Sequence, residues 1–599
     1  MKLLIVESPN KTRKIREFLG RDYQVAASYG HVRDLPMSGD LAIGFQDGRV
    51  EPHYEPLERS RDAIANLKRL ADEAEEVLLA TDPDREGEAI AWHLSQVLGK
   101  RPYRRVIFHA LTKADVVKAV ANPRLLDSHL VDAQQARRVL DRVVGWLVSP
   151  TLRRLGKDAR SAGRVQSVAL RFVAEREREI GKFNAVDYFI LSALVEKPGT
   201  PPPFTARLIT WKGETLGQRL TDRAIAEKTV TWCRKQAWIV HGCDRREQAR
   251  HPPAPFSTAT VQQAASVRLG LNPDQTMKLL QTLFEGGHIT YHRTDSVSLS
   301  PEAITAARSL IKARFKPAYL PAQNVHHATK AANAQEAHEA IRPTHAETGP
   351  DALGATTEGK LYQLIWNRFI ASQMASGRDQ LTTIDIACAP GTWLVEGQPA
   401  QAMGIFQAKG KVVLFDGWRK LTGGDETDEV AKKKRGKSAK DKMGERSDDD
   451  EFAGELPLLN IGDVVDLKEL AAQERSTKPP PRYTQASLIK KLEKEGIGRP
   501  STYAAIMRTI LERQYVGEKL RKLFATPLGM SVTDFLIRHY GGNFIDVDYT
   551  VRLEADLDRI ACGEAAWQKV VTDASYAVLA LAQNAGLRGN PLTPSSLNK

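Results

Sequence analysis

Two groups of side chains, far apart in the sequence, suit chemistry on a phosphate. Asp82, Asp84 and Glu86 alternate along one short stretch, and Tyr291 stands two positions before Arg293. Clustered carboxylates offer the hard oxygen ligands that Mg²⁺ takes. A phenol is a potential nucleophile, and a neighbouring guanidinium fork matches two phosphate oxygens. Together the groups predict covalent chemistry on a phosphodiester, with Mg²⁺ as the cofactor.

The acids have a second interpretation, because Asp and Glu also favour the first turn of a helix. The surrounding pattern favours the metal site. Residues 3–6 and 77–80 are apolar runs, each followed by a polar turn and a helical pattern, to about Gly20 in the first case and from Ala89 to Leu98 in the second, which predicts buried parallel strands. The carboxyl ends of such strands meet at one edge of the sheet, where ligands collect. Glu7, which follows the first run, is therefore expected to join the acids.

The phenol needs activation. A tyrosine pKa of about 10 leaves roughly one molecule in a thousand as phenolate at neutral pH. Nucleophilic use of Tyr291 therefore requires local positive charge or a base, and Arg293 supplies fixed charge. The alternative is an ordinary half-buried tyrosine beside an exposed arginine.

Two further segments resemble motifs of other enzyme classes, zinc proteases and ATP-binding proteins, but neither motif is complete. His338 and Glu339 begin a His-Glu-x-x-His pattern, but Arg342 replaces the second histidine, so the zinc protease helix is excluded. His338 beside Arg342 either binds a phosphate or is a solvated pair. The Gly-Lys-Ser at 436–438 lacks the first Walker A glycine, so no ATP site is expected. Strand rejoining without ATP must conserve bond energy, as a phosphotyrosyl ester does.

Bulk composition is compatible with DNA as the partner. The chain has 599 residues, so several domains are expected, and a net charge of +13, which favours a polyanion or merely solubilises the surface. Its four cysteines form no Cys-x-x-Cys pair, so no zinc ribbon or disulfide framework is predicted. No apolar run of about eighteen residues and no secretory signal occur, so a cytoplasmic protein is expected.

The patterns also predict an order of elements. Residues 128–180 and 482–580 are helical, whereas 185–250 and 380–417 resemble strands. Residues 256–370 return to a helical pattern, which predicts a helical domain inserted into a β domain. Residues 421–455 carry blocks of charge that rarely pack, so a disordered insert is expected there.

The chain resembles a bacterial type IA DNA topoisomerase of the topoisomerase I kind over roughly residues 1–580. The motifs that carry the resemblance are Val6-Glu7-Ser8-Pro9-x-Lys11, Gly30-His31-Val-Arg-Asp-Leu-Pro36, Thr81-Asp-Pro-Asp-Arg-Glu-Gly-Glu-Ala-Ile-Ala-Trp92, Ser161-Ala-Gly-Arg-Val-Gln-Ser167, Ile289-Thr-Tyr-His-Arg-Thr-Asp-Ser296, Ala337-His-Glu-Ala-Ile-Arg-Pro-Thr344 and Gly498-Arg-Pro-Ser-Thr502. Seven motifs in the family's order are a specific match.

The resemblance implies a multidomain fold of α/β, α and β parts. An N-terminal Toprim domain with a parallel α/β sheet would precede a toroidal topoisomerase core. The predicted domains are 1–125 (Toprim, metal site), 126–183 with 478–580 (helical, DNA-binding), 184–255 with 372–477 (β-rich arch), 256–371 (helical, carrying Tyr291) and 581–599 (tail).

The resemblance also implies roles for single residues. Tyr291 would attack one DNA strand and keep its 5′ phosphate, while the other strand passes and the 3′ hydroxyl reseals the break. Lys11 would protonate the leaving oxygen, Arg293 would hold the phosphate, and His338 would lie near the phenol. Mg²⁺ would be placed by Glu7, Asp82, Asp84 and Glu86, with Glu7 a possible proton carrier. The residues expected to bind DNA are His31, Arg137, Arg138, Asp141, Trp146, Arg153, Ser161, Ala162, Gly163, Arg164, Val165, Gln166 and Arg499.

Three departures from the family pattern matter. His292 stands where a methionine is usual, and an ionisable ring there would add pH dependence. Trp146 replaces a tyrosine but can still stack on a base. The C-terminal zinc ribbons of many relatives are not expected, because the cysteines for them are missing. Their loss would affect processive relaxation rather than cleavage.

The predicted function is ATP-independent relaxation of negatively supercoiled DNA by a monomer that also binds single strands and lies with the nucleoid in the cytoplasm. Two alternatives stay open. A topoisomerase III-like decatenase is one, although Glu339 argues for topoisomerase I. A Toprim nuclease or primase is the other, and it would not need Tyr291. A basic DNA-binding protein without catalysis is a third hypothesis.

Overall fold

The structure is a computed structural model of the chain. It describes residues 1–36, 43–46, 49–216, 220–327, 339–390, 403–423, 454–589 and 592. His338, residues 424–453 of the predicted charged insert and most of the tail after 589 lie outside the described residues.

A parallel sheet flanked by helices forms the N-terminal part. Its elements are β1 (Lys2–Val6), α1 (Pro9–Leu19), η1 (Gly20–Asp22), β2 (Tyr23–Ala27), β3 (Arg33–Asp34), β4 (Phe45–Gln46), β5 (Arg49–Val50), β6 (Glu55–Pro56), η2 (Glu58–Ser60), α2 (Arg61–Glu73), β7 (Glu76–Ala80), α3 (Arg85–Val97), β8 (Tyr103–Arg105) and α4 (Lys113–Ala121). The strand order is β2-β1-β7-β8, and all three pairings are parallel. The two apolar runs predicted as buried strands are β1 and β7, so that prediction is confirmed.

Alternation along β1 sends side chains to both faces of this sheet. Leu3 and Ile5 pack with α2 and α3, whereas Leu4 and Val6 pack with α1 and α4. All four are 0% exposed, and burial of each such side chain contributes about 1.5–3 kcal/mol. This rigid sheet therefore fixes the backbone from which Glu7 emerges.

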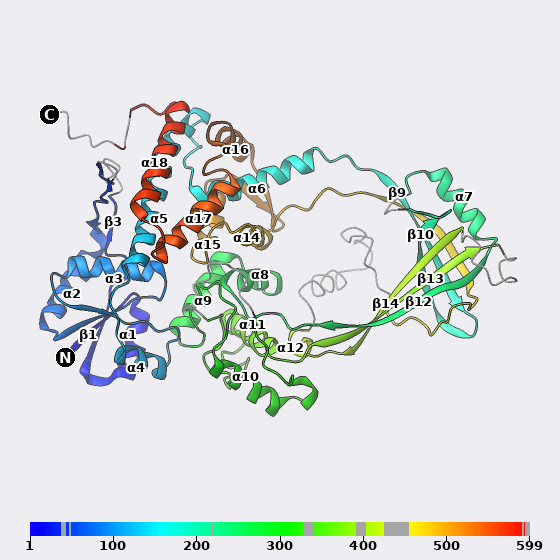
Figure 1. The fold of residues 1–599 in the computed structure, drawn as a ribbon, viewed down its shortest axis with the longest axis horizontal. Coiled ribbons are helices and arrows are strands. Elements are labelled where there is room, and N and C mark those ends of the chain that lie inside the picture. Colours follow the sequence, from blue (N-terminus) through cyan, green and yellow to red (C-terminus); the bar gives the residue numbers. More distant parts are fainter. Residues whose placement is uncertain are drawn as a thin grey trace.

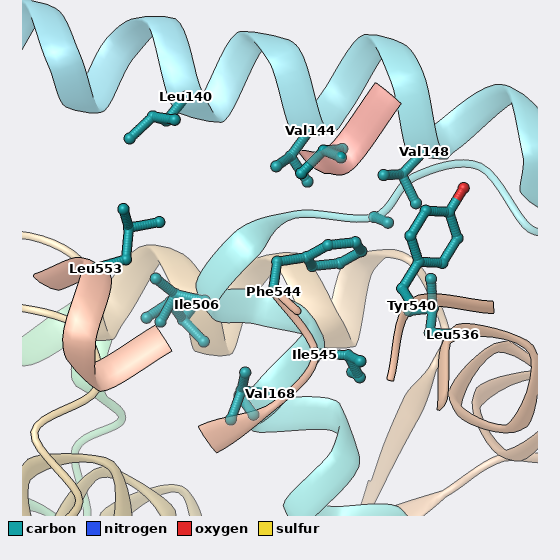
Figure 2. Packing of buried hydrophobic residues seen from close by; sticks show 14 of the residues in the cluster. Leu140, Val144, Val148, Val168, Ile506, Leu536, Tyr540, Phe544, Ile545 and Leu553 are labelled. Atoms are coloured by element: carbon teal, nitrogen blue, oxygen red, sulfur yellow. The ribbon is translucent and has the colours of Figure 1, made fainter. Parts of the chain in front are cut away.

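Helices from two distant parts of the sequence share one core. They are α5 (Ser128–Val148), η3 (Ser149–Leu155), α6 (Arg164–Gly181), α14 (Gln485–Lys494), α15 (Tyr503–Glu512), α16 (Pro527–Tyr540), α17 (Val547–Ala561) and α18 (Trp567–Asn584), with the hairpin β16 (Val516–Lys519) and β17 (Lys522–Ala525). Figure 2 shows Val144 and Val148 of α5 above the rings of Phe544 and Tyr540. The apolar face of α5 thus joins the two helical stretches that the sequence predicted, 128–180 and 482–580.

A long antiparallel sheet lies at the other end of the molecule. Its strands are β9 (Asp187–Lys197), β10 (Thr200–Trp211), β11 (Glu214–Thr215), β12 (Ala237–Arg250), β13 (Gly377–Ala389), β14 (Gly404–Phe415) and β15 (Asp466–Ser476). Their order is β12-β13-β14-β10-β9-β15, with β11 beside β10. Helix α7 (Arg223–Cys233) packs against β9 and β15.

Between β12 and β13 the chain leaves the sheet and forms helices. They are α8 (Thr258–Arg268), α9 (Pro273–Glu285), α10 (Pro301–Arg314) and α11 (Thr357–Ser372), with the short turns η4 (Pro317–Tyr319) and α12 (Arg419–Thr422) nearby. Arg250 pairs with Gly377 across the insertion. A helical segment inserted between two paired strands was predicted from the sequence, and Tyr291 belongs to its core.

The ribbon follows a ring (Figure 1). The parallel sheet and the helical layers lie at one end, and the antiparallel sheet lies at the other. Helix α6 leads toward β9 along one side, while β12, β13 and β14 run along the other side toward α11 and α12. This is the toroidal arrangement expected from the sequence.

Three local predictions were wrong. Residues 223–233 form helix α7 within a stretch assigned to strands, and 516–525 form a hairpin within a stretch assigned to helices. Helix α3 begins at Arg85 rather than Ala89, because the Asp84 side chain caps it. Among the described residues, no helix is both long and apolar enough to cross a membrane.

Candidate active site

The predicted acids lie together at the carboxyl edge of the parallel sheet. Glu7 follows β1, and Asp82 follows its neighbour β7. Buried Arg105 fixes the turn after β7, donating to the carbonyls of Thr81 at 2.9 Å and of Asp82 at 2.6 Å. Its guanidinium is held in turn by Glu88 at 2.8 Å. The backbone that carries Asp82 is therefore rigid before any ligand arrives.

Close packing brings the start of α3 onto the same turn. A Cβ on Gly87 would lie 2.0 Å from the carbonyl oxygen of Asp82, so only glycine fits. Asp84 caps the helix, with Oδ1 accepting from the Gly87 N–H at 2.8 Å. The second interpretation of the acids is thus confirmed, because Asp84 and Glu86 start a helix, and that helix start faces the end of β7.

Each acid has a partner within the protein. The Lys11 ammonium contacts Asp82 Oδ1, and both side chains are buried. The Tyr291 hydroxyl donates to Asp84 Oδ2 at 2.6 Å. Arg293 Nη1 lies 3.6 Å from the same Asp84 oxygen. The two predicted groups, acids and Tyr-x-Arg, therefore meet directly.

His31 pairs with the third acid through Nε2 and Glu86 Oε1. Burial opposes ionisation of Glu86, but the hydrogen bond and charge of His31 outweigh it and lower the Glu86 pKa to about 2. Burial likewise opposes protonation of His31, yet Glu86 raises the His31 pKa. The resemblance implies that His31 binds DNA and that Glu86 binds metal, whereas in this conformation the two side chains form one ion pair.

The surroundings of Glu7 disfavour its charged form. Burial and the adjacent Asp82 carboxylate raise its pKa to about 7, against an ordinary value of 4.5. Asp82 behaves in the opposite way, because Lys11 and Arg293 outweigh burial and lower its pKa. Glu7 is thus the acid poised to exchange a proton near neutral pH.

Tyr291 is held from its backbone as well as its hydroxyl. It is 2% exposed, its N–H donates to the His109 carbonyl at 2.8 Å, and the Phe284 ring stands edge-on at 5.3 Å. Burial and the charges of Asp84 and Asp82 raise its pKa well above the usual range. Arg293 opposes that shift without overcoming it, so the phenol is protonated here and needs a base.

The residues expected to bind DNA divide into exposed and internal ones. Arg153 and Asp141 are exposed, Trp146 is half-buried, and Arg138 forms two bonds of 2.8 Å to Asp34. Arg164 is 1% exposed and is held by Glu554, which removes its side chain from direct DNA contact in this conformation. Arg137 and Arg499 lie beside the same Glu554.

Helix α6 begins within the segment 161–166, at Arg164, with Gly163 as its N-cap. The preceding backbone is engaged internally. Ser161 N–H donates to the Tyr515 hydroxyl at 3.0 Å, and Ala162 N–H donates to Ser149 at 3.1 Å. Val165 is buried and Gln166 is half-buried in the first turn of α6. These contacts fix the loop rather than offer it to a ligand.

Several residues of the site were missed by sequence reasoning. Arg142 lies over the Trp146 ring at 5.4 Å and donates to the Leu35 carbonyl at 2.9 Å. Glu554 and Asp558 were missed as well, although they are like charges at i and i+4 on one helix. Such a pair is unfavourable without partners, which is the signal that would have found them.

Chemically, the site assembles a nucleophile, a fixed cation, an acid and bases around one point. Its oxygens are of the type that a hard divalent cation takes. The charge repulsion that raises the Glu7 pKa is also what a cation would relieve. In this conformation, however, no three His, Cys, Asp or Glu side chains of the described residues are arranged to hold a metal, because Lys11, Tyr291 and His31 engage the acids.

Comparison with known proteins gives consistent matches along the chain. A family model described as DNA topoisomerase matches residues 126–572, and a Toprim domain model matches residues 2–111. DNA topoisomerase 1 of Zymomonas mobilis is 41% identical over 583 residues, which is 95% of this chain but 45% of that relative. The chain thus spans less than half of that relative's length. A protein of Xylella fastidiosa named DNA topoisomerase I, plasmid, is 40% identical over 95% of this chain and 82% of its own length.

A solved structure has the same fold. Full-length topoisomerase I from Thermotoga maritima superimposes with a TM-score of 0.80 at 32% identity, covering 98% of this chain and 91% of that one. The match extends over both ends of the ring, so the arrangement of the domains is shared as well as the domains themselves.

Proposed function

Since the chain belongs to the DNA topoisomerase family and carries a Toprim domain at its N-terminus, we propose that it is an ATP-independent type IA topoisomerase. It cleaves one DNA strand, lets the other pass and reseals the break, which relaxes negative supercoils. The observation that carries this proposal is the contact of 2.6 Å between the Tyr291 hydroxyl and Asp84, with Arg293 beside the same carboxylate.

Cleavage is a transesterification at phosphorus. The Tyr291 oxygen forms a bond to the scissile phosphorus, and the bond from phosphorus to the 3′ oxygen breaks. The 5′ phosphate stays on the tyrosine, so one phosphodiester replaces another and no ATP is required. Arg293 stays charged, because the neighbouring Tyr291, Asp84 and Asp82 outweigh burial and raise its pKa. Its guanidinium is therefore placed to hold the phosphate oxygens.

Two proton transfers accompany this exchange. Asp84 already accepts a hydrogen bond from the phenol, so it is the base closest to the proton that must leave. Lys11, buried against Asp82, is the group proposed to protonate the departing 3′ oxygen. Resealing runs the same transfers in reverse. Glu7, with a pKa of about 7, can return the site to its starting protonation state.

The conformation described here is closed to DNA. Tyr291 is 2% exposed, between its own helical segment and the parallel sheet. DNA reaches the phenol only when this interface opens, and the contact between Tyr291 and Asp84 must form again beside the bound strand before the proton leaves. Opening of this interface is thus proposed as part of the reaction cycle.

Toprim domains typically bind a divalent metal ion, and we propose Mg²⁺ here. Glu7, Asp82 and Asp84 would hold it, since their oxygens lie at one sheet edge. Glu86 would join only after parting from His31. Bound Mg²⁺ would neutralise charge on the phosphate. His338, which the resemblance implies to lie near the phenol, is outside the described residues.

The proposed partners are single-stranded and negatively supercoiled DNA, bound by a monomer in the cytoplasm. Arg138, Arg153, Trp146, His31 and Arg499 remain proposed contacts. The domain boundaries given above likewise remain proposals.

One assay tests the function and separates it from its rivals. Negatively supercoiled and catenated circles are incubated with Mg²⁺ and no ATP, and the products are resolved on a gel. A ladder of relaxed topoisomers that needs Tyr291 supports the proposal. Unlinking without relaxation would indicate a decatenase, and nicked or linear circles without resealing would indicate a nuclease. A Tyr291→Phe variant that relaxes normally would refute the role of the phenol.

A further inference from the structure

Two acids of helix α17, Glu554 and Asp558, contact arginines from four separate elements. Glu554 is 1% exposed, and its Oε1 accepts from Arg164 Nη1 at 2.5 Å. Its other oxygen lies 3.5 Å from Arg499 Nη1 and 4.0 Å from Arg137 Nη1. One buried carboxylate thus stands at the centre of three guanidinium groups, from α5, α6 and the loop before α15.

The second acid, one helical turn later, extends the cluster to the Toprim helix. Asp558 Oδ2 accepts from Arg499 Nη2 at 2.6 Å, and its Oδ1 accepts from Arg85 Nη2 at 2.5 Å. Arg85 stands between Asp84, which binds the Tyr291 hydroxyl, and Glu86 in the sequence. Asp558 therefore ties the start of α3, and with it the acid cluster, to the loop that carries Arg499.

Charge and exposure show which groups face outward. Four guanidinium groups meet three carboxylates, because Asp141 Oδ1 also lies 3.4 Å from Arg164 Nε, so the cluster keeps a positive excess. Arg85, Arg137 and Arg499 are 17%, 20% and 23% exposed, whereas Arg164 is 1% exposed. Glu554 Oε2 makes no hydrogen bond with any of the described residues, so its attraction for Arg137 and Arg499 is electrostatic. Arg164 anchors the cluster, and the other arginines lie at its rim.

Stability alone is a poor reason for such a cluster. Burying charged groups costs several kcal/mol per ion, and apolar side chains of similar size often serve the core as well. Like charges at i and i+4 of a helix also repel. The cluster does achieve one thing that apolar residues cannot, because it fixes guanidinium forks from separate elements at neighbouring points on one surface.

We propose that Glu554 and Asp558 are positioning residues for the DNA strand: they hold Arg85, Arg137 and Arg499 in place to bind successive phosphates of a single strand beside the acid cluster. The proposal rests on the proposed function and adds residues and a mechanism to it. The ligand is the sugar-phosphate backbone, which the arginines bind whatever the base sequence.

The test uses the sign of an affinity change. Removing a negative charge near a phosphate site should, by charge alone, tighten DNA binding. If Asp558 positions the arginines, Asp558→Asn will instead weaken binding of the full chain to a single-stranded oligonucleotide by about tenfold, measured by fluorescence anisotropy without Mg²⁺. The log–log slope against salt will also become shallower by about 0.7 for each lost phosphate contact. Asp558→Glu, which keeps the charge, should restore part of the affinity.

Asp379→Asn serves as the matched control. Asp379 is 0% exposed and holds Arg419 at 2.7 Å and Arg250 at 3.0 Å, where β12 and β13 meet α12. It should lower the melting temperature yet leave affinity unchanged within about twofold. Equal or tighter binding by Asp558→Asn would overturn the inference, as would an equal loss in Asp379→Asn. Failure of the wild-type chain to cleave DNA would instead refute the proposed function.

Discussion

At the scale of single residues, the site combines groups whose protonation is pulled in opposite directions. Asp82 is kept ionised by Lys11, whereas Glu7, beside Asp82, has its pKa raised to about 7. Tyr291 is kept protonated by burial and by Asp84. A nucleophile that starts protonated next to a carboxylate depends on that carboxylate, so Asp84 is as important to the account as Tyr291.

The raised pKa of Glu7 predicts a pH-dependent cost to stability. Its ordinary pKa is 4.5 and its folded pKa about 7, so the folded state binds the proton more tightly. Stability from this group is complete below about pH 4.5 and is lost as the pH rises through 7. Glu7→Gln should therefore unfold with wild-type stability at pH 4.5 but gain ~1–3 kcal/mol at pH 8 in Mg²⁺-free buffer. Urea denaturation at both pH values measures this, and an equal difference at the two would contradict it.

His292 is expected to titrate outside the working range. Burial, and then the charge of Arg293, lower its pKa to about 3. The pH dependence anticipated for an ionisable ring at this position is therefore not expected above pH 6. His292→Met should leave the shape of the pH–rate profile of DNA cleavage between pH 6 and 9 unchanged. A profile whose midpoint moves in the variant would show that the ring titrates during the reaction.

Below that range the same histidine should cost stability. The unfolded chain takes up the proton near pH 6.5 and the folded chain only near pH 3, so stability present above pH 6.5 is lost as the pH falls. The difference between His292→Met and wild type in unfolding free energy should thus grow in favour of the variant from pH 8 to pH 5.

Part of this site follows from the sequence. Parallel strands put Glu7 and Asp82 at one edge, and this required only two apolar runs and the residues after them. The partners of the acids did not follow, because Lys11, His31 and Tyr291 reach them through contacts that depend on how helices pack. Glu554 and Asp558 were not predicted as site residues for the same reason, because the arginines that they contact lie 55 or more positions away in the sequence.

At the scale of elements, the start of α3 is the most constrained segment near the site. The Gly87 N–H donates to Asp84 Oδ1, and a Cβ at Gly87 would lie 2.0 Å from the Asp82 carbonyl oxygen. Arg105 binds that same carbonyl from the other side. The position of two of the acids thus depends on one glycine.

Gly87→Ala should displace this turn. Its Cβ would lie 2.0 Å from the Asp82 carbonyl oxygen, and overpacking of this kind costs about 1–3 kcal/mol. Gly145→Ala is the control, because Gly145 lies within α5 and its Cβ would meet nothing within 4 Å. That change should stabilise the protein by about 0.5–1 kcal/mol. Thermal unfolding of both variants tests the pair, and similar melting temperatures would contradict the packing argument.

Elements with strong periodicity were predicted, and those with weak local signals were not. Helix α7 has apolar residues at helical spacing, Ala226, Val230 and Cys233, but it lies within a stretch dominated by strands. The β16–β17 hairpin turns at Leu520 and Arg521, both with positive φ. Glycine and asparagine are the usual residues in such turns, so the residues of this turn did not indicate a hairpin.

At the scale of the whole molecule, closure of the ring hides the nucleophile. The interface beside Tyr291 includes the Asn10 amide, which donates to Glu285 Oε2 at 2.7 Å, and Lys14, which donates to the Gly286 carbonyl. These contacts join α1 to the end of α9. The sequence predicted the domains on both sides of this interface but not their closure, because closure depends on a few polar contacts between surfaces.

Loosening this interface should expose the tyrosine segment. Glu285→Ala removes two hydrogen bonds, one within α9 from Gln281 and one across the interface from Asn10. Loss of the bond across the interface, worth about 1 kcal/mol, corresponds to roughly fivefold more opening. Hydrogen exchange followed by mass spectrometry should show faster exchange of peptides covering residues 288–293. Glu17→Ala, which removes an exposed ion pair within α1 itself, should leave that exchange unchanged. Equal protection in the Glu285 variant would show that the interface is held elsewhere.

The central claim is that the Tyr291 oxygen carries the broken strand, and one measurement tests it most directly. A single-stranded oligonucleotide labelled at its 3′ end is incubated with the protein and Mg²⁺, the reaction is stopped with detergent, and the digested adduct is mapped by mass spectrometry. The account predicts a labelled polypeptide whose modification is a 5′-phosphonucleotide on Tyr291, and none in Tyr291→Phe. Label found only on free DNA, or attached to another residue, would contradict it.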